Sequence, residues 1–212
     1  MFDAIAPRYE LVNKLMTLGL DSRWRRRAVS DLRLARNSVV LDVATGTGDF
    51  ARELERQHHR AVGTDLSYNM LREARNVTER VQADASSLPF RGASFDGVTC
   101  GYALRNFTDL QATFDEMARV LRPGGRLSLL EVAEPSGGPW RAGFRLWFRK
   151  VVPFIGSLLS DRDAYHYLPA STAYLPTTRE ITSMLNRAGF SAVNNRRVMG
   201  GLSQQFLATR TS

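Results

Sequence analysis

The sequence predicts a single α/β domain of 212 residues, with a mostly parallel sheet of seven strands covered by helices on both faces. Three observations lead to this prediction. Short apolar runs alternate with stretches of helical periodicity, the first run leads into a glycine-containing turn, and no linker or internal repeat divides the chain. Residues 1–36 are expected to form a basic helical segment, and residues 135–175 resemble an insertion rich in aromatic residues, glycine and proline.

Strands are expected where apolar runs end in turn residues, as in Val39-Val40-Leu41-Asp42-Val43. The expected strands are residues 39–43, 61–66, 81–83, 95–100, 126–132, 192–197 and 202–209. The expected helices of this core are residues 49–56, 68–75, 110–121 and 178–188. Pro123-Gly124-Gly125 is expected to end the third helix, because proline cannot continue it and glycine accepts a positive φ.

The composition is that of a globular protein with a basic balance of 29 Lys and Arg against 21 Asp and Glu, a net charge of +8. This charge favours attraction to nucleic acid or an anionic membrane, and a solvated basic surface explains it equally well. The chain has neither an apolar run of roughly 18 residues nor a secretory signal pattern, so a cytoplasmic location is expected. The single cysteine excludes an internal disulfide, and the histidine spacing predicts no metal site.

The turn after the first strand has the features of a nucleotide-binding loop. Gly46 and Gly48 remove a Cβ where the turn is tight and a ligand must reach the backbone, and the N–H groups of the next helix point into the same space. With Ala51, the pattern also satisfies the dinucleotide fingerprint G-x-G-x-x-A. The structural alternative is an ordinary turn between a strand and a helix.

Two acidic residues follow at the ends of the next two strands. Asp65, about 20 residues after the glycines, is placed to accept both ribose hydroxyls. Its alternative role is that of an acid favoured at a helix N-terminus. Asp84 stands where it can accept from an adenine amino group, although a lone Asp there is often only a turn residue. The order of these features predicts a nucleoside site.

The same residues resemble the motifs of class I methyltransferases that depend on S-adenosylmethionine (SAM), which have a Rossmann-like fold. This resemblance implies that SAM is bound by Asp42, Gly46, Thr47, Gly48, Asp65, Asp84, Ala85 and Gly101, with Tyr9 closing over it. Gly101 stands where a serine often contacts SAM, so only its backbone can serve.

The chain resembles more specifically the ubiquinone/menaquinone biosynthesis C-methyltransferases. The matching segments are residues 2–9 with Asn13 and Trp24-Arg25, residues 104–109, residues 119–126 with Leu130-Glu131, and residues 164–169 with Ser171. This resemblance implies C-methylation of a prenylated quinol ring, from demethylmenaquinol to menaquinol. A different aromatic or small-molecule acceptor is the alternative.

Ring methylation needs donors that stabilise a phenolate, and a base. Arg105 and Asn106 are the expected donors, because they follow the fourth strand at the ligand-binding edge of the sheet. Their alternative role is to brace the following helix. Tyr165 and His166 are also expected at the site, with His166 as the base. Their alternative role is lid packing.

Residues 140–152 have the pattern of an amphipathic helix. An apolar stripe at helical spacing is flanked by Arg141, Arg145 and Arg149. The pattern favours peripheral binding at the inner face of the membrane, where a prenylated quinol would be met. The alternative is a core-facing helix or a homodimer face.

Two further classes of protein compete with a methyltransferase. The dinucleotide fingerprint suggests a nicotinamide dehydrogenase, but Asp84 and Leu88-Pro89-Phe90 do not belong to that pattern. The positive charge suggests a nucleic-acid binder, but no basic-aromatic RNA motif is present, so no nucleic-acid partner is expected.

Overall fold

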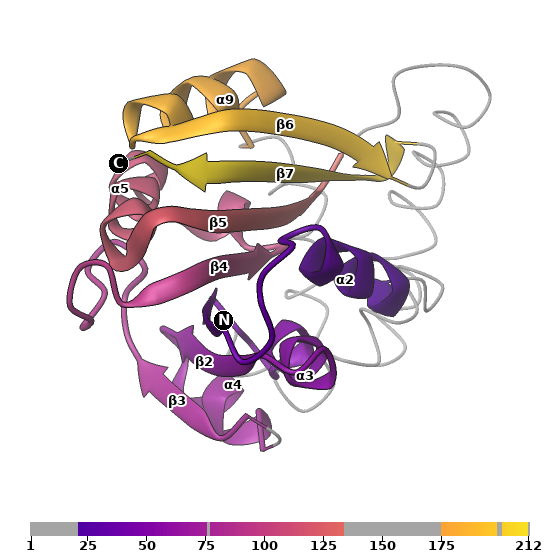
Figure 1. The fold of residues 1–212 in the computed structure, drawn as a ribbon, viewed down its shortest axis with the longest axis vertical. Helices are drawn as coiled ribbons and strands as arrows, with labels where there is room; N and C mark the ends of the chain where they lie inside the picture. The colour runs from indigo at the N-terminus through magenta and orange to yellow at the C-terminus, as the bar shows by residue number, and fades with distance from the viewer. Residues whose placement is uncertain (1–20, 76, 134–174, 199–200, 212) are drawn as a thin grey trace, which may run out of the picture.

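The computed structural model describes residues 21–75, 77–133, 175–198 and 201–211. Seven strands form one sheet in the order β3-β2-β1-β4-β5-β7-β6. Strands β1 to β5 pair in parallel, and β7 runs antiparallel between β5 and β6 (Figure 1). The mostly parallel seven-stranded sheet predicted from the sequence is therefore confirmed.

The strands and helices agree with the predicted elements, with ends that differ by a few residues. The strands are β1 (Val39–Val43), β2 (Arg60–Asp65), β3 (Glu79–Gln82), β4 (Phe95–Gly101), β5 (Leu121–Val132), β6 (Phe190–Val198) and β7 (Ser203–Arg210). In the described ranges the helices are α2 (Asp21–Ser30), α3 (Asp49–Arg56), α4 (Tyr68–Glu73), α5 (Leu110–Val120) and α9 (Thr178–Arg187), and Leu104–Asn106 form the short 3-10 helix η1.

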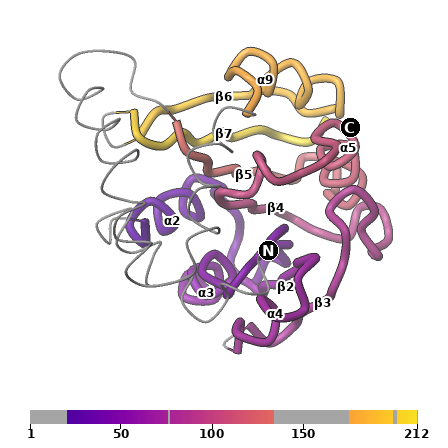
Figure 2. Tube along the Cα trace, turned by 180° about the vertical axis from the view of Figure 1, so that it is seen from behind, coloured from indigo at the N-terminus to yellow at the C-terminus, as the bar shows by residue number. Residues whose placement is uncertain are grey.

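Two apolar cores lie on opposite faces of the sheet. Successive side chains of a strand point to opposite faces, so Val40 packs in the core beneath α2 and α3, whereas Leu41 and Val43 pack in the core beneath α5 and α9. Figure 2 shows the same arrangement of helices from behind. Burial on both faces explains why β1 is a continuous apolar run interrupted only by Asp42.

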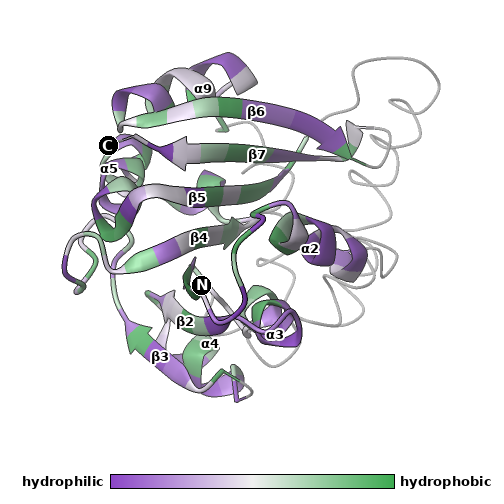
Figure 3. Ribbon diagram, in the orientation of Figure 1, coloured by the Kyte–Doolittle hydropathy of each residue, from purple (hydrophilic) through white to green (hydrophobic). Residues whose placement is uncertain are grey.

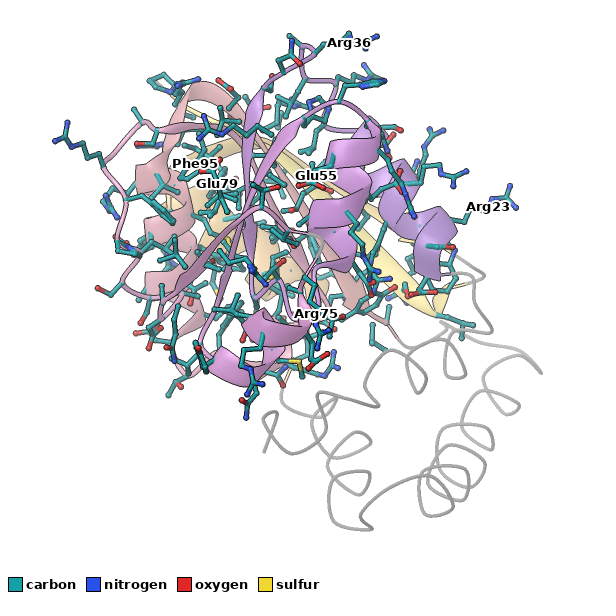
Figure 4. All side chains as sticks on the ribbon, turned by 90° about the horizontal axis from the view of Figure 1, so that it is seen from below. Arg23, Arg36, Glu55, Arg75, Glu79 and Phe95 are labelled. Carbon is teal, nitrogen blue, oxygen red and sulfur yellow. The ribbon has the colours of Figure 1, made fainter. Side chains whose placement is uncertain are left out.

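Polar residues cover the outside of this sandwich. Figure 3 shows hydrophilic residues on α2 and α9 and hydrophobic residues along the central strands. Arg23 and Arg36 are exposed and extend away from the body of the protein (Figure 4). None of the helices in the described ranges is long and apolar enough to cross a membrane.

The helix before Pro123-Gly124-Gly125 ends as predicted, but these three residues lie inside β5, which begins five residues earlier than the predicted strand. α5 ends at Val120, and β5 begins at the next residue. The register between β4 and β5 then shifts: Leu121 pairs with Phe95 and Arg126 with Gly97. Residues 122–125 therefore bulge out of the ladder, and Gly124 has a φ of +79°. Proline is tolerated there because a bulged residue need not donate to the neighbouring strand.

Candidate functional site

A cavity opens at the carboxyl edge of the sheet, beside the ends of β1, β2 and β4. Strand order reverses between β1 and β4, and open α/β sheets bind their ligands at this kind of switch point. Of the residues predicted from the sequence, the cavity is lined by Gly46, Asp65, Asp84, Ala85, Gly101 and Asn106. Residues from five separate segments of the chain therefore meet in one place.

The glycine turn between β1 and α3 leaves room for a ligand. Gly46 and Gly48 have φ angles of +57° and +87°. A Cβ on Gly48 would lie 2.5 Å from Val77 Cγ2, whereas one on Gly46 would meet no atom within 4 Å. The hydroxyl of Thr47 is buried and has no hydrogen-bond partner in the described part of the chain. Because an unpartnered buried hydroxyl is unfavourable, the turn is suited to a polar ligand.

Asp65 connects this turn to the next one. Its Oδ2 accepts from the Gly46 N–H at 2.8 Å, and its Oδ1 accepts from the Ser67 N–H at 2.9 Å. Ser67, and not Asp65, is the N-cap of α4, because its side chain accepts from the Met70 N–H. Asp65 therefore holds the glycine turn in place while it lines the cavity.

Asp84 is an ionised acceptor at the cavity wall. Its Oδ1 accepts from the backbone N–H and the hydroxyl of Ser86, at 2.8 and 2.7 Å. The backbone hydrogen bond and the hydroxyl hydrogen bond from Ser86 lower the pKa of Asp84. The turn role and the ligand role proposed from the sequence are compatible at this position.

Asp42 lies behind the cavity wall and is 1% exposed. The hydroxyls of Thr45 and Thr99 donate to its two carboxylate oxygens at 2.6 and 2.8 Å. Burial raises the pKa of Asp42 to about 7, although both hydroxyl hydrogen bonds oppose the rise. The structure thus places Asp42 as a brace between β1, the glycine turn and β4, and not among the residues that line the cavity.

The raised pKa of Asp42 predicts a pH-dependent stability. Between the ordinary value of 3.8 and about 7, the folded state holds a proton that the unfolded state has lost. Raising the pH through this range therefore favours unfolding. Relative to Asp42→Asn, the unchanged protein is expected to lose about 2–3 kcal/mol of stability between about pH 5 and about pH 8, measured by urea unfolding. Parallel pH profiles for the two proteins would contradict the prediction.

Gly101 is required by the packing of an aromatic ring against the end of β4. A Cβ at this position would lie 2.5 Å from Phe50 Cε2. A serine at this position therefore cannot be accommodated beside Phe50 without a shift of the ring. The backbone of Gly101 still lines the cavity.

Gly101→Ser is expected to lower the free energy of unfolding by about 1–3 kcal/mol, because overpacking forces Phe50 to move. In the Phe50→Leu background the same substitution should cost less, since the smaller side chain leaves space. Thermal or urea unfolding of the four proteins measures the coupling between the two positions. Additive effects would show that the ring is not what excludes the serine.

A buried arginine that sequence reasoning did not assign to the site joins α2 to the cavity. Arg25 is 7% exposed, pairs with Asp21, and lies 3.1 Å from Asp49 at the start of α3. Its guanidinium carbon also lies 6.0 Å from the rings of Phe50 and Tyr102. Tyr102 lines the cavity, so a helix outside the sheet supports both the glycine turn and the cavity wall. The only signal in the sequence was the resemblance of Trp24-Arg25 to the family.

Arg105 and Asn106 have different surroundings although they are adjacent in η1. Asn106 lines the cavity. Arg105 is almost buried, and its Nη1 lies 2.6 Å from Oε1 of the fully buried Glu131. This geometry favours the bracing role for Arg105 and leaves Asn106 as the member of the pair that reaches the cavity.

Several predicted site residues lie outside the described residues. They are Tyr9, Tyr165, His166 and the 140–152 segment with Arg141, Arg145 and Arg149. Within the described ranges, no cluster of His, Cys, Asp and Glu is arranged to hold a metal ion.

Comparison with known proteins identifies the family. Residues 1–210 match the model of the ubiE/COQ5 methyltransferase family. The chain belongs to this family. It is 41% identical to the ubiquinone/menaquinone biosynthesis C-methyltransferase UbiE of Syntrophotalea carbinolica, over all of this chain (100%) and 93% of that protein. It is 44% identical to the demethylmenaquinone methyltransferase of Deinococcus radiodurans, over 90% of this chain and 83% of that protein.

The fold is shared with more distant methyltransferases. Phosphoethanolamine N-methyltransferase 2 of Haemonchus contortus, solved with phosphomonomethylethanolamine and S-adenosylhomocysteine, superposes with a TM-score of 0.68. The two chains are 15% identical, and the match covers 90% of this chain and 53% of that one. This ubiE/COQ5 family member is thus a SAM-dependent methyltransferase with the class I fold. The antiparallel β7 also distinguishes its sheet from the dinucleotide-binding arrangement, which argues against a dehydrogenase.

Proposed function

We propose that this enzyme methylates a ring carbon of a prenylated quinol, with demethylmenaquinol as the substrate. The observation that carries the proposal is that Asp65, Asp84 and Gly46 of the glycine turn line the same cavity as Asn106. The first three fit SAM, and Asn106 belongs to the segment that resembles the quinone C-methyltransferases. The names of the relatives in Syntrophotalea and Deinococcus support the same substrate class.

The chemistry requires a nucleophilic ring carbon in line with a methyl group. SAM supplies that methyl on a sulfonium sulfur. An ionised ring hydroxyl pushes electrons to the carbon, the new C–C bond forms as the S–C bond breaks, and loss of the ring proton restores aromaticity. The amide of Asn106 is suited to donate a hydrogen bond to the ring oxygen, and Phe107 gives the cavity an apolar wall beside it. His166 remains the proposed base.

We also propose that the enzyme binds its substrate at a membrane surface, because the prenyl chain of the quinol favours the lipid bilayer. The basic amphipathic segment 140–152 is suited to that contact, because aromatic residues favour the headgroup region and arginines favour lipid phosphate. Self-association through this segment is the competing proposal.

The experiment is a methylation assay with chemically reduced demethylmenaquinone, followed by mass spectrometry of the product. We expect one added methyl on a ring carbon, and faster turnover when a long-chain substrate is supplied in anionic vesicles. An O-methylated product, or transfer only to other aromatic acceptors, would overturn the quinol assignment. Equal rates with and without vesicles, together with a dimer in sedimentation, would favour self-association.

A further inference from the structure

We infer that Glu131 is a positioning residue for methyl transfer, because this buried acid fixes the backbone of η1 and thereby presents Asn106 to the substrate. The inference rests on the proposed function, in which Asn106 binds the quinol ring. Glu131 itself does not line the cavity. Its effect is therefore exerted through the residues to which it is bonded.

One carboxylate holds the first two residues of η1. Glu131 lies near the end of β5 and is 0% exposed. Its Oε2 accepts from the Leu104 N–H at 2.9 Å. Its Oε1 accepts from Arg105 Nη1 at 2.6 Å and from the Val132 N–H at 2.8 Å. Both oxygens are thus used, and two of the three donors belong to the turn that carries Asn106.

Leu104 anchors the turn in the apolar core, but the backbone of the turn has few hydrogen bonds of its own. Within η1 and its caps, the Asn106 N–H donates to the Ala103 carbonyl at 2.8 Å, and the Phe107 N–H reaches the Leu104 carbonyl only at 3.4 Å. A single turn with one good internal hydrogen bond does not persist on its own. The polar anchor at Glu131 therefore adds to the apolar packing of Leu104 in setting the position of Asn106 in the cavity.

The anchor is poorly explained by stability alone. Burying an ion pair costs desolvation of both charges, and apolar residues of similar volume often serve stability as well or better. The Nε of Arg105 is also buried and meets no acceptor among the described residues, which is a further cost. A polar contact that lowers folding stability and lies directly behind the cavity wall is expected where the orientation of the backbone matters for substrate binding.

Two substitutions of Glu131 separate the effect of its negative charge from the effect of its side-chain length. Glu131→Gln keeps the shape but places an N–H against a donor, so at least one of the three hydrogen bonds is lost. Glu131→Asp keeps the charge but is one methylene shorter. We expect kcat to fall at least about tenfold for Glu131→Gln, with the Kd for SAM within about threefold of the unchanged enzyme. The kcat of Glu131→Asp should lie between those of the unchanged enzyme and Glu131→Gln, because aspartate retains the negative charge opposite Arg105.

The matched control is Glu53→Gln on α3. Glu53 is 5% exposed and lies 3.7 Å from Arg26 and 3.6 Å from Arg56, so it is also a buried acid with arginine partners. It makes no contact with η1 in the hydrogen bonds and ion pairs of the described residues. Its kcat should stay within about twofold, even if its melting temperature falls as much as that of Glu131→Gln.

The decisive measurement is a double-mutant cycle with Asn106→Ala. If Glu131 acts through Asn106, adding Glu131→Gln to Asn106→Ala should lower kcat by less than about threefold. Multiplicative losses, or a parallel loss of SAM affinity, would overturn the inference. Should Glu131→Gln fail to fold, Glu131→Asp completes the same cycle. Failure of the unchanged enzyme to methylate a quinol would refute the proposed function, whereas an active Glu131→Gln enzyme would refute only this inference.

Discussion

Replacing Arg105 by alanine is expected to lower kcat at saturating SAM by at least about a hundredfold while the Kd for SAM changes less than about threefold. The substitution leaves Glu131 as a buried acid without its cationic partner, and the first turn after β4 loses its side-chain anchor. Asp65 and the glycine turn lie on the other strands of the site and keep their mutual hydrogen bonds. Steady-state kinetics and titration calorimetry measure the two quantities separately.

The control for Arg105 is Arg122→Ala. Arg122, which is exposed in the bulge of β5, pairs with Asp96 of β4, and neither residue lines the cavity. Arg122→Ala should leave kcat and the Kd for SAM within about twofold of those of the unchanged enzyme. Because breaking a buried ion pair destabilises a protein by about 3–5 kcal/mol, the Arg105 variant must be assayed well below its melting temperature. Loss of SAM affinity in proportion to kcat would show that Arg105 supports the whole cavity and has no selective effect on the transfer step.

Asp65→Ala is expected to raise the Kd for SAM by about ten- to a hundredfold, with a much smaller change in kcat once SAM is saturating. Two losses combine. The ribose hydroxyls lose their charged acceptor, and the Gly46 and Ser67 N–H groups lose the carboxylate that orders the two turns. The Kd for SAM of Asp65→Asn should lie between those of the unchanged enzyme and Asp65→Ala. Asparagine has one side-chain oxygen, whereas both carboxylate oxygens of Asp65 accept hydrogen bonds.

Asp115→Ala on the exposed side of α5 is the matched control, since it removes the same charge away from the cavity. Its SAM affinity should be unchanged. A folded Asp65→Ala protein that binds SAM as tightly as the unchanged enzyme would refute the assignment of this cavity to the cofactor. Circular dichroism establishes that each variant is folded.

The sequence predicted the fold and the cavity residues well where the signal was local. A strand that ends in glycines or an acid, followed by helical periodicity, is visible within about ten residues. Asp65, Asp84 and the glycine turn are of this kind, and the parallel sheet then brings their strand ends together.

The contacts that hold Asp42, Arg105 and Arg25 join distant segments of the chain, and no local pattern in the sequence shows them. Asp42 is held by Thr99 on a neighbouring strand, and Arg105 by Glu131, which lies 26 residues away. A motif shows that such a residue matters but not whether its side chain faces the ligand or the protein. Likewise, no local pattern shows that Arg25 on α2 reaches Asp49 and Tyr102.

The position of β7 has a consequence for how the chain folds during synthesis. β7 is the last strand in the sequence, yet it lies between β5 and β6 and carries the fully buried Phe206. While the ribosome has not yet released residues 203–210, β5 has a free edge and β6 has no neighbour in the sheet. An unpaired edge invites association with other chains. During synthesis, strands β1 to β5 can therefore pair while the edge of β5 that β7 later covers is still exposed. A nonsense mutation before Phe206 would leave the chain permanently without β7, with this edge of β5 unpaired.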